Sequence, residues 1–304
     1  MKHLKKIFPL FFILACGAST DSEKPFNEEL GYKFREDDKS LLWEISGKGL
    51  KQPSFLYGTI HLQDKRVFSF DKTVTKIFDT CKAYAMEVNM DEVDKMEMAK
   101  SLMLDKPLNE IIGEKKFGLL DSLFKVRTGS GLGMMYSRMK PFFMAAELIK
   151  AYEHQDMTFP LDIELFNKAK KEKMKVIGIE KMEEQLSAVN KMTIDEQTDM
   201  VIEGLKDWDK SKELYNKMIG VYLKQDIEQM ALLMKDTTMP ASFETALLTD
   251  RNKVMAKRID KIVQEQPTFN AVGAGHLYGK DGVIELLRKE GYTMKPVKYK
   301  FTKK

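Results

Sequence analysis

Cysteine, long apolar runs and an excess of one charge are all scarce in this chain. Its 304 residues include two cysteines, Cys16 and Cys81, which are too few for a disulfide framework or a cysteine-based metal cluster. No run approaches the roughly twenty apolar residues that a membrane-spanning helix needs. Lysine and arginine number 50 against 46 acidic residues, and because no dense basic stripe occurs we predict no nucleic-acid partner. Folding must therefore rest on a hydrophobic core.

The first residues have the pattern of an export signal. Residues 1–6 (MKHLKK) are basic and residues 7–15 (IFPLFFILA) are a short apolar run, which is typical of a secretory signal rather than a membrane span. The sequence ILAC at residues 13–16 is similar to the lipobox, in which the cysteine is acylated and becomes the new N-terminus. The alternative is an ordinary signal with an accidental cysteine.

From this pattern we expect three segments. Residues 1–15 are a lipoprotein signal peptide, residues 16–37 a lipidated N-terminus and flexible tether, and residues 38–304 one folded domain. Acylated Cys16 would attach the protein to the lipid bilayer in the cell envelope, facing the periplasm or the outside. Cys81 is then left without a disulfide partner, and we expect it to be a small buried residue.

Short strand-like segments alternate with helical ones along the rest of the chain. Apolar and β-branched runs predict strands at residues 54–62, 83–90, 175–180, 268–273 and, at a sheet edge, 294–301. Apolar residues at helical spacing predict helices at residues 74–78, 161–173, 213–235, 251–264 (capped by Asp250) and 282–290. This alternation favours an α/β fold, with a mixed central sheet flanked by helices and a long helical middle region.

Two histidines occupy the same local pattern. GTIH ends at His61 and GAGH ends at His276, and each motif follows an extended apolar segment. Ligands of open α/β sheets gather at the carboxyl ends of strands. The motif glycines, Gly58, Gly273 and Gly275, allow the backbone to approach a bound group closely. We therefore expect both motifs to line a site.

A carboxylate lies in a comparable place. Glu87 interrupts the apolar strand at residues 83–88, where an ionised carboxylate must be paired, hydrogen-bonded or bound to a metal. Two imidazoles and one carboxylate with an open position form a known catalytic zinc arrangement, and the same ligands serve manganese, cobalt or iron. The alternative is two satisfied core histidines and a salt-bridged Glu87. Glu180 also ends an apolar strand and is the rival carboxylate, whereas His154 lies in no motif and is expected to be superficial or structural.

Several stretches together resemble the TraB/GumN family. They are the first GxxH motif, the strand ending AMEV at Glu87, LDIELFNKAKKEKMKVIGIEKMEEQL from Leu161, TDRN at residues 249–252, and VGAGHLYGKDGVIELLRKEGYTMKPV from Val272. The resemblance covers residues 41–297 and is carried most specifically by GxGHLxGxxG. The family includes the Tiki proteins, membrane-anchored proteases that cleave Wnt proteins. It implies a domain at residues 38–304 related to erythromycin esterases and the haem-binding ChaN lipoproteins.

The resemblance also implies roles for particular residues. In Tiki-like proteins the two GxxH histidines and a strand glutamate form the site, which corresponds here to His61, His276 and Glu87. An arginine corresponding to Arg251 would lie beside them, where it is suited to stabilise an oxyanion or orient a carbonyl. The function implied is a metal-dependent hydrolase, a peptidase acting on a peptide or protein. The three ligands would hold a divalent manganese, cobalt or zinc ion, with Glu87 as the third ligand or the general base.

Two other functions remain open at this point. One is a metal-independent, esterase-like hydrolase that uses histidine as the general base. The other is a ligand-binding lipoprotein of the haem type, without turnover.

Lipidation can be tested at Cys16. We expect the full chain, expressed in a bacterium, to fractionate with membranes, because a diacyl anchor binds stably where one acyl chain is marginal. Cys16→Ser should release the chain or leave it unprocessed, as judged by fractionation and by the mass of its N-terminal peptide. A variant that stays fully membrane-bound, with no unprocessed form present, would contradict this prediction.

Overall fold

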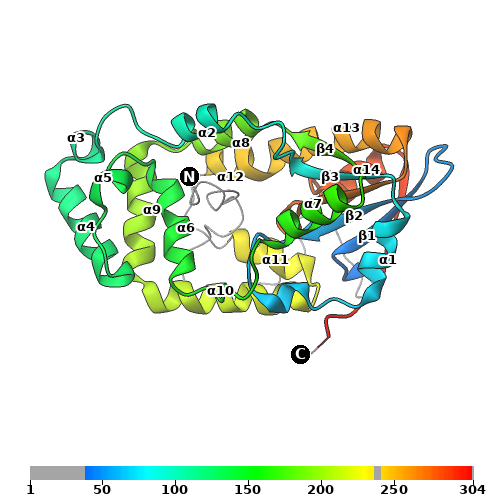
Figure 1. Ribbon diagram of the computed structural model, residues 1–304, viewed down its shortest axis with the longest axis horizontal. Helices are drawn as coiled ribbons and strands as arrows, with labels where there is room; N and C mark the ends of the chain where they lie inside the picture. Colours follow the sequence, from blue (N-terminus) through cyan, green and yellow to red (C-terminus); the bar gives the residue numbers. More distant parts are fainter. Residues whose placement is uncertain (1–37, 236–240, 303–304) are drawn as a thin grey trace.

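The computed structural model describes residues 38–235 and 241–302. The expected signal peptide, Cys16 and the tether lie outside the described residues. The centre of the fold is a six-stranded sheet with the strand order β4-β3-β5-β2-β1-β6 (Figure 1). The strands are β1 Leu42–Gly47, β2 Ser54–Thr59, β3 Ala83–Val88, β4 Lys175–Glu180, β5 Thr268–Gly273 and β6 Tyr292–Pro296. Because β1 runs in the opposite direction to the other five strands, the sheet is mixed, and the predicted α/β fold is confirmed.

Helices connect the strands and build the half of the molecule away from the sheet (Figure 1). Among the described residues no helix is long and apolar enough to cross a membrane. The helices before β4 are η3 Lys65–Phe68, α1 Lys72–Thr80, α2 Lys95–Ser101, α3 Leu108–Ile112, α4 Glu114–Thr128, α5 Gly133–Tyr136, α6 Pro141–Lys150 and α7 Leu161–Lys171. Those after it are α8 Met182–Val189, α9 Ile194–Lys206, α10 Trp208–Leu223, α11 Ile227–Lys235, α12 Ala241–Glu244, η4 Thr245–Thr249, α13 Asp250–Glu265, η5 Ala274–His276 and α14 Val283–Lys289.

Most predicted elements are confirmed, and the structure corrects four points. The strand predictions correspond to β2 to β6, but the bounds of the last are wrong, because β6 is Tyr292–Pro296 and not residues 294–301. β1 is not indicated by any pattern above, since its six residues (LWEISG) are interrupted by polar ones. The single helix over residues 213–235 is wrong, because Gln225 has a φ of +56° and separates α10 from α11. Asp250 does not cap α13. The π-helical turn η4 leads directly into α13, and the backbone of Asp250 is already helical.

The two faces of the sheet carry different side chains. On one face an aromatic series crosses three strands, with ring centroids 5.7 Å apart for Tyr57 and Phe269, 5.1 Å for Phe269 and Phe78, and 5.6 Å for Phe78 and Tyr84. The Tyr84 hydroxyl donates to the backbone of α7. Because successive side chains of a strand point to opposite faces, Glu87 lies on the other side of β3, toward α13. The two faces of β3 therefore meet different helices, α7 on the side of Tyr84 and α13 on the side of Glu87.

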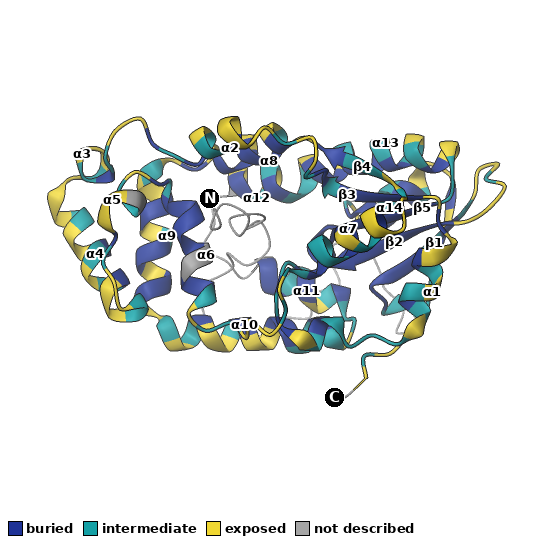
Figure 2. Cartoon of the chain, viewed as in Figure 1, coloured by how far each residue is buried: buried dark blue, intermediate teal, exposed yellow. Residues whose placement is uncertain are grey.

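Two hydrophobic cores lie along the molecule, and Figure 2 shows the buried strands and inner helix faces that form them. The larger core joins the sheet to α1, α7, α10, α11, α13 and α14. The second joins α3, α4, α6, α8, α9 and the segment from Phe243 to Leu247. Cys81, at the end of α1, is buried with a free thiol, as predicted, and burial raises its pKa to about 12. That thiol is therefore an inert packing group.

Gly58 lies where the two GxxH motifs meet. A Cβ at this position would be 2.6 Å from Cδ1 of Leu277 and 3.1 Å from Cα of Ala274, both in the second motif's segment. The first motif therefore needs glycine so that the second can pack against β2.

Gly58→Ala should lower the free energy of unfolding by about 1–3 kcal/mol, since an added methyl in a filled space forces the neighbours to shift. Urea denaturation measures this. The control is Gly118→Ala in α4, where a Cβ would meet nothing within 4 Å, so that change should stabilise the helix by roughly 0.5–1 kcal/mol. Equal effects of the two substitutions would contradict the packing role.

Candidate active site

Four parallel strands end at one edge of the sheet, and the candidate residues lie there. Thr59 of β2 pairs with Gly273 of β5, so the segments leading to His61 and His276 leave the sheet side by side. Glu87 is the last residue but one of β3, and Glu180 is the last of its neighbour β4. Carboxyl ends of parallel strands are the usual ligand-binding edge of such sheets.

Glu87 is held by three donors. Its Oε1 accepts the backbone N–H of Gly273 at 2.7 Å, and its Oε2 accepts Nη2 of Arg251 at 2.9 Å and Nε2 of Gln185 at 2.9 Å. The side chain nevertheless remains 21% exposed, against 1% for Glu180. The carboxylate is thus fixed in orientation and still reachable.

Arg251 joins Glu87 to Glu180. Its Nε lies 3.1 Å and 3.2 Å from the two oxygens of Glu180, and its Nη2 lies 2.7 Å from Oε2. Nε2 of Gln185 also reaches that Oε2, at 3.4 Å. Nη2 of Arg251 and Nε2 of Gln185 therefore each donate to Oε2 of Glu87 and to Oε2 of Glu180. This arrangement keeps two acidic groups close together in a buried place, which requires such compensation.

The two carboxyl groups differ in their affinity for protons. Burial acts to raise the pKa of Glu87, but the charge of Arg251 and the N–H of Gly273 outweigh it, so the pKa lies below its ordinary value. For Glu180 burial prevails over Arg251, and its pKa is raised. Two carboxyl groups with opposite shifts are typical of sites that need one ionised carboxylate.

His276 is fixed by Asn252. Nδ1 of the imidazole lies 2.6 Å from Oδ1 of Asn252, whose Nδ2 donates to the carbonyl of Asp281 at 2.9 Å. Since that carbonyl can only accept, the amide must present its oxygen to His276, and Nδ1 must carry the hydrogen. Burial, followed by the charge of Arg251, lowers the pKa of His276 to about 3. The neutral imidazole therefore has its lone pair on Nε2, which is the form that binds metals.

His61 is fixed in the same manner by a different partner. Its Nδ1 lies 2.6 Å from Oδ1 of Asp162, and because an ionised carboxylate only accepts, Nε2 again has the lone pair when the ring is neutral. Asp162 lies in the first turn of α7, where the helix dipole favours a negative charge. Both motif histidines thus have Nδ1 bound to an oxygen, as is usual for metal ligands.

The chemistry of these donors fits a divalent ion, and their positions fit it in part. Nε2 of His276 and Oε1 of Glu87 are 3.9 Å apart, and an ion about 2.1 Å from each ligand spans at most about 4.2 Å. Within residues 38–235 and 241–302, however, no group of three His, Cys, Asp or Glu side chains surrounds a common position. Two of the three expected ligands are therefore neighbours, while His61 is held by Asp162.

The structure brings Glu87, His276 and Arg251 into one cluster. Glu180, the rival of Glu87, belongs to the same cluster through Arg251, so the two glutamates are partners rather than alternatives. His154 is exposed, as predicted.

Three supporting residues are not indicated by the sequence analysis. Asp162 and Gln185 both lie in the stretch from Leu161 that is quoted only for its resemblance. Asn252 had one signal, its place directly after Arg251 in TDRN.

The sheet and its flanking helices make this chain an α/β protein, with glutamate, histidine and arginine gathered at the carboxyl edge of its parallel strands. The profile of the TraB/PrgY/gumN family matches residues 41–296, and the chain belongs to that family.

Three similar curated proteins carry the name metalloprotease. Metalloprotease TIKI1 of Danio rerio is 24% identical, with 85% of this chain and 63% of the relative covered. Metalloprotease TIKI2 of Xenopus tropicalis is 24% identical (86% and 60%), and metalloprotease TIKI1 of Homo sapiens 23% identical (92% and 66%). This chain thus spans 60–66% of the length of these relatives. No solved structure matches it.

Asn252→Leu tests the support of His276. Loss of the acceptor of a buried N–H should lower the free energy of unfolding by about 1–3 kcal/mol, and nitrogen NMR of the imidazole should show the hydrogen shared between Nδ1 and Nε2. The control is Asn216→Leu on α10, an exposed residue whose amide donates to the carbonyl of Lys212. An unchanged tautomer in the Asn252 variant would refute the inferred role.

Proposed function

We propose that this protein is a metal-dependent hydrolase that cleaves peptide bonds at the carboxyl edge of its sheet. The observation that carries the proposal is the pair formed by Glu87 and His276. An oriented, ionised carboxylate lies 3.9 Å from the nitrogen of a neutral imidazole, in a chain similar to the Tiki metalloproteases. The relatives support the reaction class, and the geometry supports the residues.

Each side chain has a role in this proposal. His61, His276 and Glu87 would hold the divalent ion, which supplies a water of lowered pKa when it is bound. Asn252 and Asp162 keep Nε2 of each histidine unprotonated by binding the other ring nitrogen. Glu87 would be either the third ligand or the general base that accepts a proton from the attacking water, and Gly273 fixes its carboxylate through the backbone N–H. Arg251 is placed to orient a substrate carbonyl and to stabilise negative charge on it.

We further propose that the enzyme works at a membrane surface. The lipobox-like ILAC motif at residues 13–16 supports acylation of Cys16, followed by a polar tether up to residue 37. A tethered peptidase of this kind would act on peptide or protein substrates in the cell envelope.

Metal binding is the first measurement. His61→Ala and His276→Ala should each lower the content of manganese, cobalt or zinc, measured by elemental analysis of the purified chain, because losing one of three ligands weakens a site severely. His154→Ala is the matched control and should retain the metal. Equal metal content in all three variants would count against the proposed ligands.

Glu87→Gln separates catalysis from structural pairing. The substitution preserves size but removes the negative charge, so peptide hydrolysis should fall by roughly 10²–10⁴-fold. The single amide oxygen can accept from Gly273 or from Arg251 and Gln185, but not from both sides. The free energy of unfolding should therefore fall by about 1–3 kcal/mol, with Arg251 still bound to Glu180. Turnover of a peptide library with and without manganese, together with urea denaturation, measures both quantities.

The control for this variant is Glu285→Gln, which breaks a different Arg–Glu pair, with Arg288 on α14, and should leave turnover unchanged. If Glu87 is instead only a buried ion-pair partner, its loss should cost about 3–5 kcal/mol with turnover retained. That result would reject the catalytic role.

A further inference from the structure

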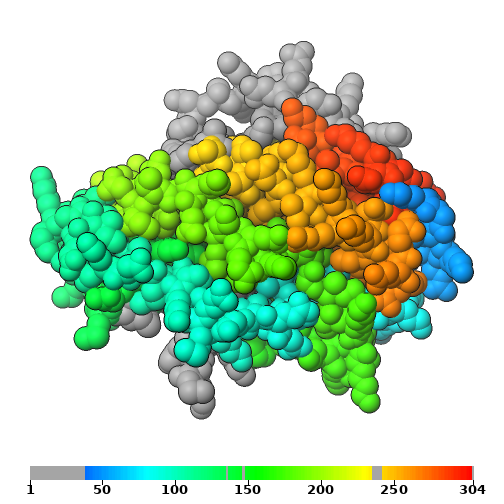
Figure 3. All heavy atoms as spheres, turned by 90° about the horizontal axis from the view of Figure 1, so that it is seen from above, coloured from blue at the N-terminus to red at the C-terminus, as the bar shows by residue number. Residues whose placement is uncertain are grey.

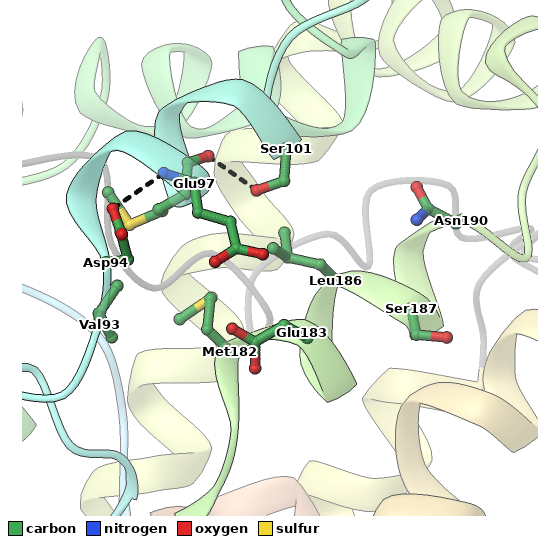
Figure 4. Close-up of a pocket in the computed structure, with 10 residues that line it drawn as sticks. Val93, Asp94, Glu97, Ser101, Met182, Glu183, Leu186, Ser187 and Asn190 are labelled. Atoms are coloured by element: carbon green, nitrogen blue, oxygen red, sulfur yellow. Dashed lines mark hydrogen bonds between the residues drawn. The ribbon is translucent and has the colours of Figure 1, made fainter.

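A small hollow lies between α2 and α8, next to the candidate active site. It encloses about 210 Å³ (Figure 4). The helix α2 follows β3, and α8 follows β4, so both begin at the edge of the sheet where Glu87 and Glu180 lie. The side chains of Met98, Met182 and Leu186 are buried and give the hollow an apolar floor. In the space-filling view α2 (cyan) and α8 (green) lie on the same face (Figure 3).

Carboxylates surround this floor. Glu97 extends from α2 toward α8, where Glu183 lies, and Asp94 is beside them (Figure 4). Asp94 accepts the backbone N–H groups of Met96 and Glu97 at 2.8 Å and 3.1 Å. In the part of the chain that the structure describes, no ion pair neutralises Glu97 or Glu183. The hollow therefore combines an apolar floor with the negative charges of Glu97 and Glu183 at its rim.

A second hollow lies along α8. It has a volume of about 380 Å³, and Glu180 and Arg251, the ion-pair partners of the candidate site, form part of its wall. Both hollows are lined by Glu183 and Ser187, so these two residues lie on the ridge between them. Gln185 of the same helix binds Glu87. A chain segment lying across α8 would contact both hollows at once.

We propose that the hollow between α2 and α8 binds the side chain of a lysine or arginine in the substrate peptide. This inference rests on the proposed function and adds to it the class of substrate. Lysine and arginine bury an apolar stem and keep a cationic end at the surface, which matches the apolar floor and the acidic rim. The volume corresponds to about seven waters at roughly 30 Å³ each and lies below the roughly 300–1,000 Å³ of small-molecule pockets. A side chain therefore fits it better than a complete small ligand.

Binding to short peptides tests the proposal. Fluorescent ten-residue peptides carry one lysine, or norleucine, which has a similar stem without the charge. Fluorescence anisotropy with the full chain in EDTA measures affinity without turnover. We expect the lysine peptide to bind more tightly, and Glu97→Gln/Glu183→Gln to weaken it about five- to tenfold, as expected for two partly exposed ion pairs. Norleucine peptides should bind that variant and the wild type equally.

The matched control is Glu110→Gln/Glu203→Gln, which removes the same charge from exposed positions on α3 and α9 outside both hollows. Equal affinity for lysine and norleucine peptides, no binding of either, or an equal loss in the control variant would overturn the proposal. Cleavage of the same peptides with added manganese separates the two ideas. Cleavage without lysine preference would reject only this inference, whereas lysine-dependent binding without cleavage would reject only the proposed function.

Discussion

The candidate site depends on one buried guanidinium. Arg251 is 5% exposed in its side chain and lies between Glu87 and Glu180, which end neighbouring strands. Without this positive charge, two carboxylates could not both remain ionised in a buried place. The same ion pairs hold α13 against the ends of β3 and β4. Removing one partner of a buried ion pair leaves an uncompensated charge. Both the fold and the candidate site therefore require the positive charge of Arg251.

The parallel strands decide which side chains meet. Glu87 and Glu180 are 93 residues apart in the sequence, and GTIH and GAGH are more than 200 apart, yet the shared direction of β2, β3, β4 and β5 brings their ends to one edge. Close contact between the two GxxH motifs then requires Gly58, whose missing side chain leaves space for Leu277. The motif is therefore a packing requirement as well as a source of histidines.

The supporting residues make the site more specific than its three central side chains alone. Asn252 and Asp162 each bind Nδ1 of a histidine, and Gln185 bridges the two carboxylates. Such outer contacts fix tautomer and orientation, which side-chain identity by itself leaves open. Gln185 also places α8 between the site and the second hydrophobic core, because its neighbours Met182 and Leu186 pack into that core.

The sequence alone determined the alternation of strands and helices, the family, and the candidates His61, Glu87, Arg251 and His276. Those features are local, since periodicity and short motifs are written in adjacent residues. Only the tertiary structure decided that Glu180 joins Glu87 on one arginine and that Gln225, with a positive φ, separates α10 from α11. It also decided that Asp162, rather than a shared ligand position, binds His61. The shared arginine and the partner of His61 depend on contacts between residues distant in sequence. The break at Gln225 depends on backbone strain that neighbouring contacts must offset. No local sequence pattern encodes such contacts or such strain.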